Sequence, residues 1–109
     1  MKKLYSNFIN SINGLKIAFK ENSFILEIVL GVFLIPYIFL SNIDLNYKII
    51  LSVLYFLLLA FEIMNTAVEK LCDRVTTDLD PEIKKIKDLS SAAVFLVLTL
   101  LVIIFLVTF

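Results

Sequence analysis

Apolar residues dominate three stretches of the chain, and each, counted with its flanking residues, is long enough to form a membrane-spanning helix. They are residues 25–40, residues 49–64 and residues 89–109, and the last has no charged side chain over 21 positions. About 20 predominantly apolar residues suffice for an α-helix to cross the hydrocarbon core of a bilayer. With the flanking residues that continue each helix, the pattern predicts transmembrane helices at 24–41, 48–72 and 88–109.

Residues 4–20 show a different pattern, in which apolar and polar side chains fall on opposite faces of a helix. The apolar face includes Leu4, Phe8, Ile12, Leu15 and Phe19, whereas the side chains on the opposite face are polar, namely Ser6, Asn7, Asn10, Asn13 and Lys20. An amphipathic helix with lysines near both ends is typical of the membrane interface, although a helix that docks on another protein would look similar. We therefore expect an all-α integral membrane protein in which one domain, residues 1–109, combines a surface helix with three transmembrane helices.

Two polar links separate the predicted spans, and their charges predict the orientation of the chain. In the second link, residues 76–87, Pro81 follows Asp80, as in a short helix capped by aspartate with proline at its first position. Four basic residues precede the first span and five lie between Lys70 and Lys87, against Lys48 alone in the first link. Because cytoplasmic loops carry the excess of lysine and arginine, we expect a cytoplasmic N-terminus and an external C-terminus.

Composition and charge exclude several classes of protein. The chain is 61% hydrophobic, and 10 basic residues balance 10 acidic ones, so it lacks the positive charge that a nucleic-acid-binding protein needs. It has one cysteine, Cys72, and no histidine, which leaves no set of ligands for zinc and no Cys/His nucleophile. Neither GxxxxGK[ST] nor GxGxxG occurs. Acid–base chemistry must therefore use carboxylates or lysines.

The polar side chains of the second predicted span share one helix face. At 100° per residue, Glu62, Glu69 and Asp73 lie within about 40° of one another, and Asn65 lies about 60° to one side. Glu69 is roughly 10 Å above Glu62 along the helix axis. This polar stripe, defined as Glu62, Asn65, Glu69 and Asp73, extends from the hydrocarbon region to the aqueous edge.

The two glutamates of the stripe suit different chemistry. A charged side chain at membrane depth costs about 2.5–3.5 kcal/mol, which makes Glu62 a candidate general base for a lipid hydroxyl, or a carboxylate that holds helices together through hydrogen bonds. Glu69, nearer the water, suits Mg²⁺ bound together with nucleotide phosphates. Glu21, at the start of the first span, could join it or could be a solvated charge at a helix end, and Glu27 lies deeper on the same helix.

A third group of residues lies where the last span begins. Lys87 could bind phosphate as a point charge beside Asp88, and the small residues 90–93 allow close helix approach. An interfacial anchor and ordinary packing are the simpler interpretations. A non-enzymatic membrane assembly protein would explain the spans, and a cation channel would use Glu62, but neither predicts the whole polar stripe.

These residues resemble a known family. The segment from Glu62 to Glu69, EIMNTAVE, resembles the E-x-x-N-[ST]-A-x-E signature of the prokaryotic diacylglycerol kinases, a family that includes undecaprenol kinases. Asp73–Arg74, Asp80–Pro81 and the segment 86–93, IKDLSSAA, extend the similarity over nearly the whole chain. The resemblance implies a homotrimer in the bacterial inner membrane, with active sites shared between protomers.

The resemblance also implies a role for each candidate site residue. The expected activity is ATP- and Mg²⁺-dependent phosphorylation of diacylglycerol to phosphatidic acid, with undecaprenol as the alternative acceptor. Glu62 would be the general base, and Glu21 and Glu69 would hold Mg²⁺ with ATP. The remaining roles are nucleotide contacts by Asp78, Leu79, Asp80, Lys87 and Asp88, support of the site by Asn65 and Asp73, and lipid contacts by Phe24, Glu27 and Ser91.

Overall fold

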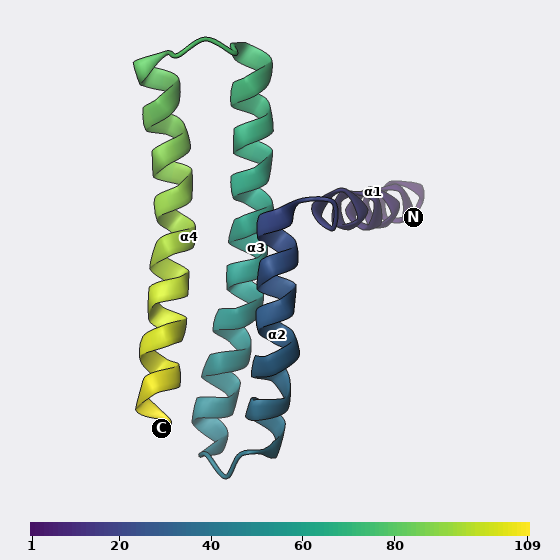
Figure 1. Ribbon diagram of the computed structural model, residues 1–109. Helices are drawn as coiled ribbons and strands as arrows, with labels where there is room; N and C mark the ends of the chain where they lie inside the picture. Colours follow the sequence, from purple (N-terminus) through teal and green to yellow (C-terminus); the bar gives the residue numbers. More distant parts are fainter.

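The computed structural model describes residues 1–109 and contains only helices (Figure 1). In chain order they are α1 (Lys2–Ala18), α2 (Asn22–Leu40), α3 (Leu45–Val75) and α4 (Pro81–Val107). The last three are long and apolar enough to cross a membrane. The predicted fold class, a surface helix followed by three membrane-spanning helices, is therefore confirmed.

The first helix lies apart from the other three and points sideways from the start of α2 (Figure 1). Ala18, at its last turn, is its one buried residue, whereas Leu4, Tyr5 and Phe8 are exposed. At the corner, the Phe19 ring packs edge-to-face on Phe24 with their centroids 5.2 Å apart. The corner is thus the part of α1 that is fixed to the bundle, and its apolar face has no partner within the chain.

The central helix of the bundle is α3, which packs against both α2 and α4. The last two helices run side by side along their length, whereas α2 and α4 make few direct contacts. Large apolar side chains from all three helices form the core, namely Leu34, Ile38, Leu51, Tyr55, Leu58, Val97 and Leu101. The polar stripe begins directly above this core, because Glu62 follows Leu58 by one helical turn.

A helical hairpin formed by the ends of α3 and α4 extends beyond α2 (Figure 1). A hydrogen bond joins Ser23, at the start of α2, to Glu62, so the 13 residues from there to Val75 reach about 20 Å past α2. The expected short helix at Pro81 is present, but it continues without a break into the last span. Asp80 caps it, and no proline or glycine interrupts the residues that follow.

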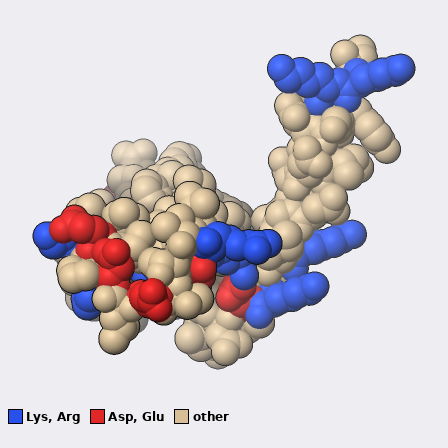
Figure 2. Space-filling model, turned by 90° about the horizontal axis from the view of Figure 1, so that it is seen from above, with Lys and Arg blue, Asp and Glu red and all other residues tan.

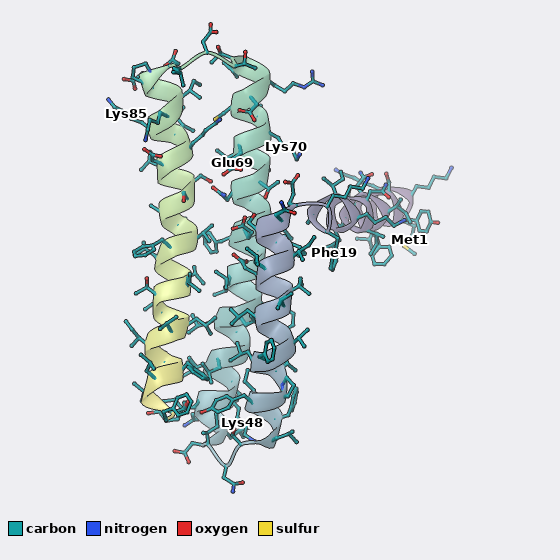
Figure 3. The ribbon with its side chains drawn as sticks, in the orientation of Figure 1. Met1, Phe19, Lys48, Glu69, Lys70 and Lys85 are labelled. Atoms are coloured by element: carbon teal, nitrogen blue, oxygen red, sulfur yellow. The ribbon has the colours of Figure 1, made fainter.

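The charged side chains gather at this end of the molecule. Viewed from above the hairpin, acidic and basic groups lie side by side over its tip, and basic side chains mark both ends of α1 (Figure 2). Lys70 and Lys85 lie at this end, whereas Lys48 lies at the opposite end of the bundle (Figure 3). The links that are rich in basic residues in the sequence therefore lie at one end of the folded bundle, and the link that is poor in them lies at the other end.

Gly31 permits the closest approach between α2 and α3. A Cβ atom at this position would overlap the hydroxyl of Tyr55, which is buried and donates a hydrogen bond of 2.9 Å to the carbonyl oxygen of Glu27. We expect Gly31→Ala to lower the free energy of unfolding by about 1–3 kcal/mol, the usual range for overpacking a core. Denaturation of the protein in detergent micelles, followed by circular dichroism, measures this change.

Gly14, on the exposed surface helix, is the matched control. Nothing lies within 4 Å of a Cβ at this position. Gly14→Ala should be neutral or stabilise the helix by roughly 0.5–1 kcal/mol, because alanine loses less backbone entropy than glycine. Equal stability of the two variants would show that the Tyr55 side chain moves aside for a methyl group at position 31 without loss of packing.

Candidate active site

Glu62 is a buried carboxylate at the junction of α2 and α3. Only 4% of its surface is exposed, and the Ser23 hydroxyl donates a hydrogen bond of 2.5 Å to its Oε1 atom. The Glu27 carboxyl group, from one turn further along α2, lies against it. The structure thus brings Glu27 and Glu62, two of the predicted site residues, together in a partly apolar setting.

Two buried oxygen atoms beside this carboxylate have no hydrogen-bond partner. They are Oε1 of Glu27 and Oδ1 of Asn65. A buried acceptor without a donor costs about 1–3 kcal/mol, so native proteins seldom leave one unpaired without a reason. A hydroxyl group is a suitable donor for either atom. These two oxygen atoms therefore fit an alcohol that binds next to Glu62.

Glu69 lies above Glu62 on α3, with its side chain exposed and oriented toward the gap between α3 and α4 (Figure 3). The Asn65 amide donates a hydrogen bond of 3.1 Å to its Oε1 atom. Glu21 does not meet it within the chain, because its carboxylate pairs with Lys70 Nζ at 2.9 Å. Asn65 therefore orients one candidate metal ligand, whereas Lys70 holds the other.

The acidic residues fit a cation that a nucleotide helps to bind. No three His, Cys, Asp or Glu side chains of the chain are close enough to hold a metal ion unaided. Mg²⁺ needs fewer protein ligands, because it is usually bound by one or two carboxylates together with phosphate oxygens and water. Glu69 supplies exposed oxygen ligands of this kind, and Glu21 could supply more once Lys70 releases it.

One ion pair joins the two helices of the projecting hairpin. Lys87 Nζ lies 2.7 Å from Asp73 Oδ1, which joins α4 to the outer end of the polar stripe. Lys84 pairs with Asp88 at 2.7 Å within α4. Both pairs are largely exposed, so they orient side chains more than they stabilise the fold. Lys87 and Asp88 therefore lie at the level of Asp73, above Glu69.

The loop between α3 and α4 forms one wall of a surface cavity of about 510 Å³. Asp80 accepts hydrogen bonds from the backbone N–H groups of Glu82 and Ile83, at 2.8 and 3.2 Å, which confirms it as the predicted cap. The Asp78 N–H donates to Thr76 Oγ1 at 3.0 Å. The cavity is lined by Asp78, Leu79, Asp80, Pro81, Ile83, Lys84 and Lys87. It thus brings together four of the seven residues expected to bind ATP, whereas Glu21, Glu69 and Asp88 do not line it.

The residues expected to contact lipid lie on different elements. Phe24 is 2% exposed and packs at the corner between α1 and α2. Ser91 is exposed on α4, and Glu27 lies beside Glu62. The structure places Glu27 within the candidate site and Phe24 at the corner between α1 and α2, and the lipid contacts of Phe24, Glu27 and Ser91 stay predictions.

The structure adds three residues that the sequence did not indicate. Ser23 binds the candidate base, Lys70 binds Glu21, and Tyr55 supports the backbone of Glu27. Serine, lysine and tyrosine are common near the ends of membrane helices, so their types give no signal. Spacing could have indicated Tyr55 alone, because it precedes Glu62 by seven residues and therefore shares its helix face.

Comparisons with known proteins agree with this arrangement. The prokaryotic diacylglycerol kinase family matches residues 9–109 of the chain. A diacylglycerol kinase of Pseudomonas aeruginosa is 32% identical over 102 residues, which cover 93% of this chain and 83% of the relative. A diacylglycerol kinase of Haemophilus influenzae is 40% identical over 90 residues, which cover 81% and 75%.

The chain belongs to the prokaryotic diacylglycerol kinase family. It is a lipid kinase with membrane-spanning helices, as the sequence predicted. The match includes the polar stripe, the loop of residues 76–80 and the start of α4. The buried Glu62 and the cavity at the hairpin tip are therefore parts of one kinase fold.

Proposed function

We propose that this lipid kinase is an ATP- and Mg²⁺-dependent diacylglycerol kinase, which makes phosphatidic acid at the cytoplasmic face of the membrane. The observation that carries the proposal is the position of Glu62, a buried carboxylate at the inner end of a polar stripe whose outer end reaches the hairpin cavity. A lipid hydroxyl at one end and a nucleotide at the other would meet along α3. The names of the two relatives support diacylglycerol as the acceptor.

Phosphoryl transfer in this site needs one proton acceptor and several groups that position charge. The acceptor oxygen forms a bond to the γ-phosphorus of ATP while the bond from that phosphorus to the β–γ bridging oxygen breaks. The hydroxyl proton passes to Glu62, and ADP leaves. Mg²⁺, when bound, neutralises charge on the phosphates. Glu21 and Glu69 would hold it, and Asn65 keeps the Glu69 carboxylate in place.

The other site residues have roles that follow from their positions. Lys87 and Asp88, with the loop residues Asp78, Leu79 and Asp80, would contact ATP in the cavity at the hairpin tip, and Asp73 positions Lys87. The unpaired oxygen of Glu27 would accept a hydrogen bond from the lipid head group, close to Ser23 and Glu62. Phe24 and Ser91 would border the bound lipid.

The cytoplasmic placement of the site and a homotrimeric assembly are also proposals. The excess of basic side chains at the hairpin end supports a cytoplasmic hairpin, a cytoplasmic N-terminus and an external C-terminus in the bacterial inner membrane. The exposure of Glu69 and Ser91 supports a site that a neighbouring protomer completes.

The direct test is transfer of labelled γ-phosphate from ATP to diacylglycerol and, in parallel, to undecaprenol. Purified protein in mixed micelles is assayed with and without Mg²⁺. We expect labelled phosphatidic acid that requires Mg²⁺ and little labelled undecaprenyl phosphate. Preferential labelling of undecaprenol would contradict the acceptor and leave the kinase mechanism intact, whereas labelling without divalent cations would contradict the metal requirement.

The ion pair between Lys70 and Glu21 predicts a change in the Mg²⁺ requirement. Because the ammonium group occupies a carboxylate proposed to bind the cation, Lys70→Ala should lower the Mg²⁺ concentration at half-maximal activity. The pair is partly exposed and worth about 0.2–1 kcal/mol, so we expect up to about a five-fold decrease. Lys85→Ala, which removes a pair to Glu82 alone, is the control. A higher Mg²⁺ requirement in Lys70→Ala would instead mean that Lys70 assists phosphate binding.

A further inference from the structure

The hydroxyl group of Ser23 differs from other hydroxyls of the chain in the partner to which it donates. Serine and threonine within a helix often donate to the carbonyl oxygen four residues earlier in the same helix. Ser11, Ser52 and Thr99 do so, at 3.0, 2.8 and 2.8 Å. Ser23 instead donates to the Glu62 carboxylate of α3, at 2.5 Å. Its hydroxyl therefore links two helices rather than two turns of one helix.

The position of Ser23 at the start of α2 explains this partner. The helix begins at Asn22, so Ser23 is its second residue. The residue four positions earlier is Phe19, which lies at the corner between α1 and α2 and belongs to neither helix. Because no turn of α2 precedes Ser23, its hydroxyl has no carbonyl oxygen of its own helix to bond. It is free to donate to a side chain of α3.

The acceptor of this hydrogen bond is the buried carboxylate proposed as the general base. Glu62 is 4% exposed, whereas Ser23 lies at the surface of the bundle. Hydrogen bonds from a hydroxyl to an ionised carboxylate are typically about 2.5–2.7 Å long, and the bond between these two residues falls in that range. It uses the Oε1 atom of Glu62. The other carboxylate oxygen, Oε2, is left to accept a proton.

We propose that Ser23 is a positioning residue, which holds the Glu62 carboxylate in the orientation from which it accepts the hydroxyl proton of the lipid. The inference rests on the proposed function, in which Glu62 is the base. A glutamate side chain has several rotatable bonds, so without a partner at its end the carboxylate would sample several orientations. Proton transfer requires the base to lie within hydrogen-bonding distance of the hydroxyl, and a small displacement therefore slows the reaction.

The packing of α2 on α3 has other sources, which argues against a purely structural role for Ser23. The Tyr55 hydroxyl of α3 donates a hydrogen bond of 2.9 Å to the carbonyl oxygen of Glu27 in α2. Apolar side chains of both helices, among them Ile38 and Leu58, belong to the core. Ser23 adds to these contacts a bond to the one side chain that is proposed to take up the proton.

Substitution of Ser23 tests the proposal by its separate effects on kcat and KM. Ser23→Ala removes the donor, and we expect kcat for lipid phosphorylation to fall about 10- to 100-fold while the KM values for ATP and diacylglycerol change by less than about two-fold. Ser52→Ala is the matched control, because it removes a hydroxyl that bonds its own helix. It should retain full activity.

Threonine and valine at position 23 separate the effect of the hydroxyl from that of side-chain shape. The two side chains have nearly the same shape, and the exposure of position 23 leaves room for the additional methyl group. Ser23→Thr should restore kcat to within about three-fold of the unsubstituted protein, whereas Ser23→Val should be as slow as Ser23→Ala. Equal kcat values for the threonine and valine variants would overturn the inference.

A double substitution shows whether Ser23 acts through Glu62. In a protein that carries Glu62→Gln the base is absent, so adding Ser23→Ala should lower the remaining rate by less than about two-fold. A further loss of ten-fold or more would mean that Ser23 acts independently of Glu62.

Two other results with Ser23→Ala would overturn the inference. An unchanged kcat would show that the carboxylate keeps its orientation without the serine. A lower KM for diacylglycerol with an unchanged or increased kcat would show that the serine hydroxyl competes with the lipid hydroxyl for Glu62. In both cases the unsubstituted protein still makes phosphatidic acid, whereas its failure to do so would contradict the proposed function itself.

Discussion

Replacement of Glu62 by glutamine is expected to reduce kcat for lipid phosphorylation by about 1,000-fold, within the range of roughly 100- to 10,000-fold that general bases contribute. Glutamine preserves the shape of the side chain and can still accept the hydrogen bond from Ser23, which lies 2.5 Å from the carboxylate. It cannot take up the hydroxyl proton. The loss should therefore appear in kcat, while the KM values for ATP and lipid change little.

Three measurements separate this expectation from a purely structural role of Glu62. Size-exclusion chromatography and thermal unfolding of Glu62→Gln should match those of the unsubstituted protein, because the buried volume is unchanged. Glu82→Gln, at an exposed carboxylate paired with Lys85, should retain full activity. A Glu62→Gln protein that is folded and active to within ten-fold would mean that the carboxylate holds α2 and α3 together and that another group accepts the proton.

The sequence predicts those features that depend on periodicity along one helix. The three spans follow from apolar length, and the alignment of Glu62, Asn65, Glu69 and Asp73 follows from the 3.6-residue repeat. The structure confirms the three spans and also the Asp80 cap. Such predictions succeed because the relation between these residues is fixed by the helix itself and needs no knowledge of its neighbours.

Features that depend on how the helices meet could not be predicted in this way. The partner of Glu21 is Lys70, one residue after the Glu69 that Glu21 was expected to join, because the position of α2 around α3 decides which side chain is nearest. The contact of Ser23 with Glu62 arises from the same packing. The continuous α4 was missed because polar residues 81–87 look like a separate loop helix, although nothing in them stops a helix.

The second large effect concerns the cation. Glu69→Ala is expected to lower kcat/KM for ATP by at least about 100-fold and to raise the Mg²⁺ concentration at half-maximal activity by ten-fold or more. Asn65 orients this carboxylate through a hydrogen bond of 3.1 Å, so the ligand is held ready for the metal. Mg²⁺ is bound by only one or two protein carboxylates, so the loss of one removes a large share of the ligands that the protein provides. The dependence of activity on Mg²⁺ at saturating ATP measures the change.

Metal binding can also be measured without turnover, which distinguishes loss of the cation from damage to the fold. Mn²⁺ can replace Mg²⁺ at oxygen ligands, and its paramagnetism reports how much is bound in the presence of a non-hydrolysable ATP analogue. Glu69→Ala should bind less Mn²⁺, whereas Asp44→Ala, at the far end of α3, should bind as much as the unsubstituted protein. If Glu69→Ala changed neither Mn²⁺ binding nor the Mg²⁺ requirement, the cation would bind away from Glu69 and α3. Because Glu62 lies about 10 Å further along the same helix, that result would leave its role as a base intact.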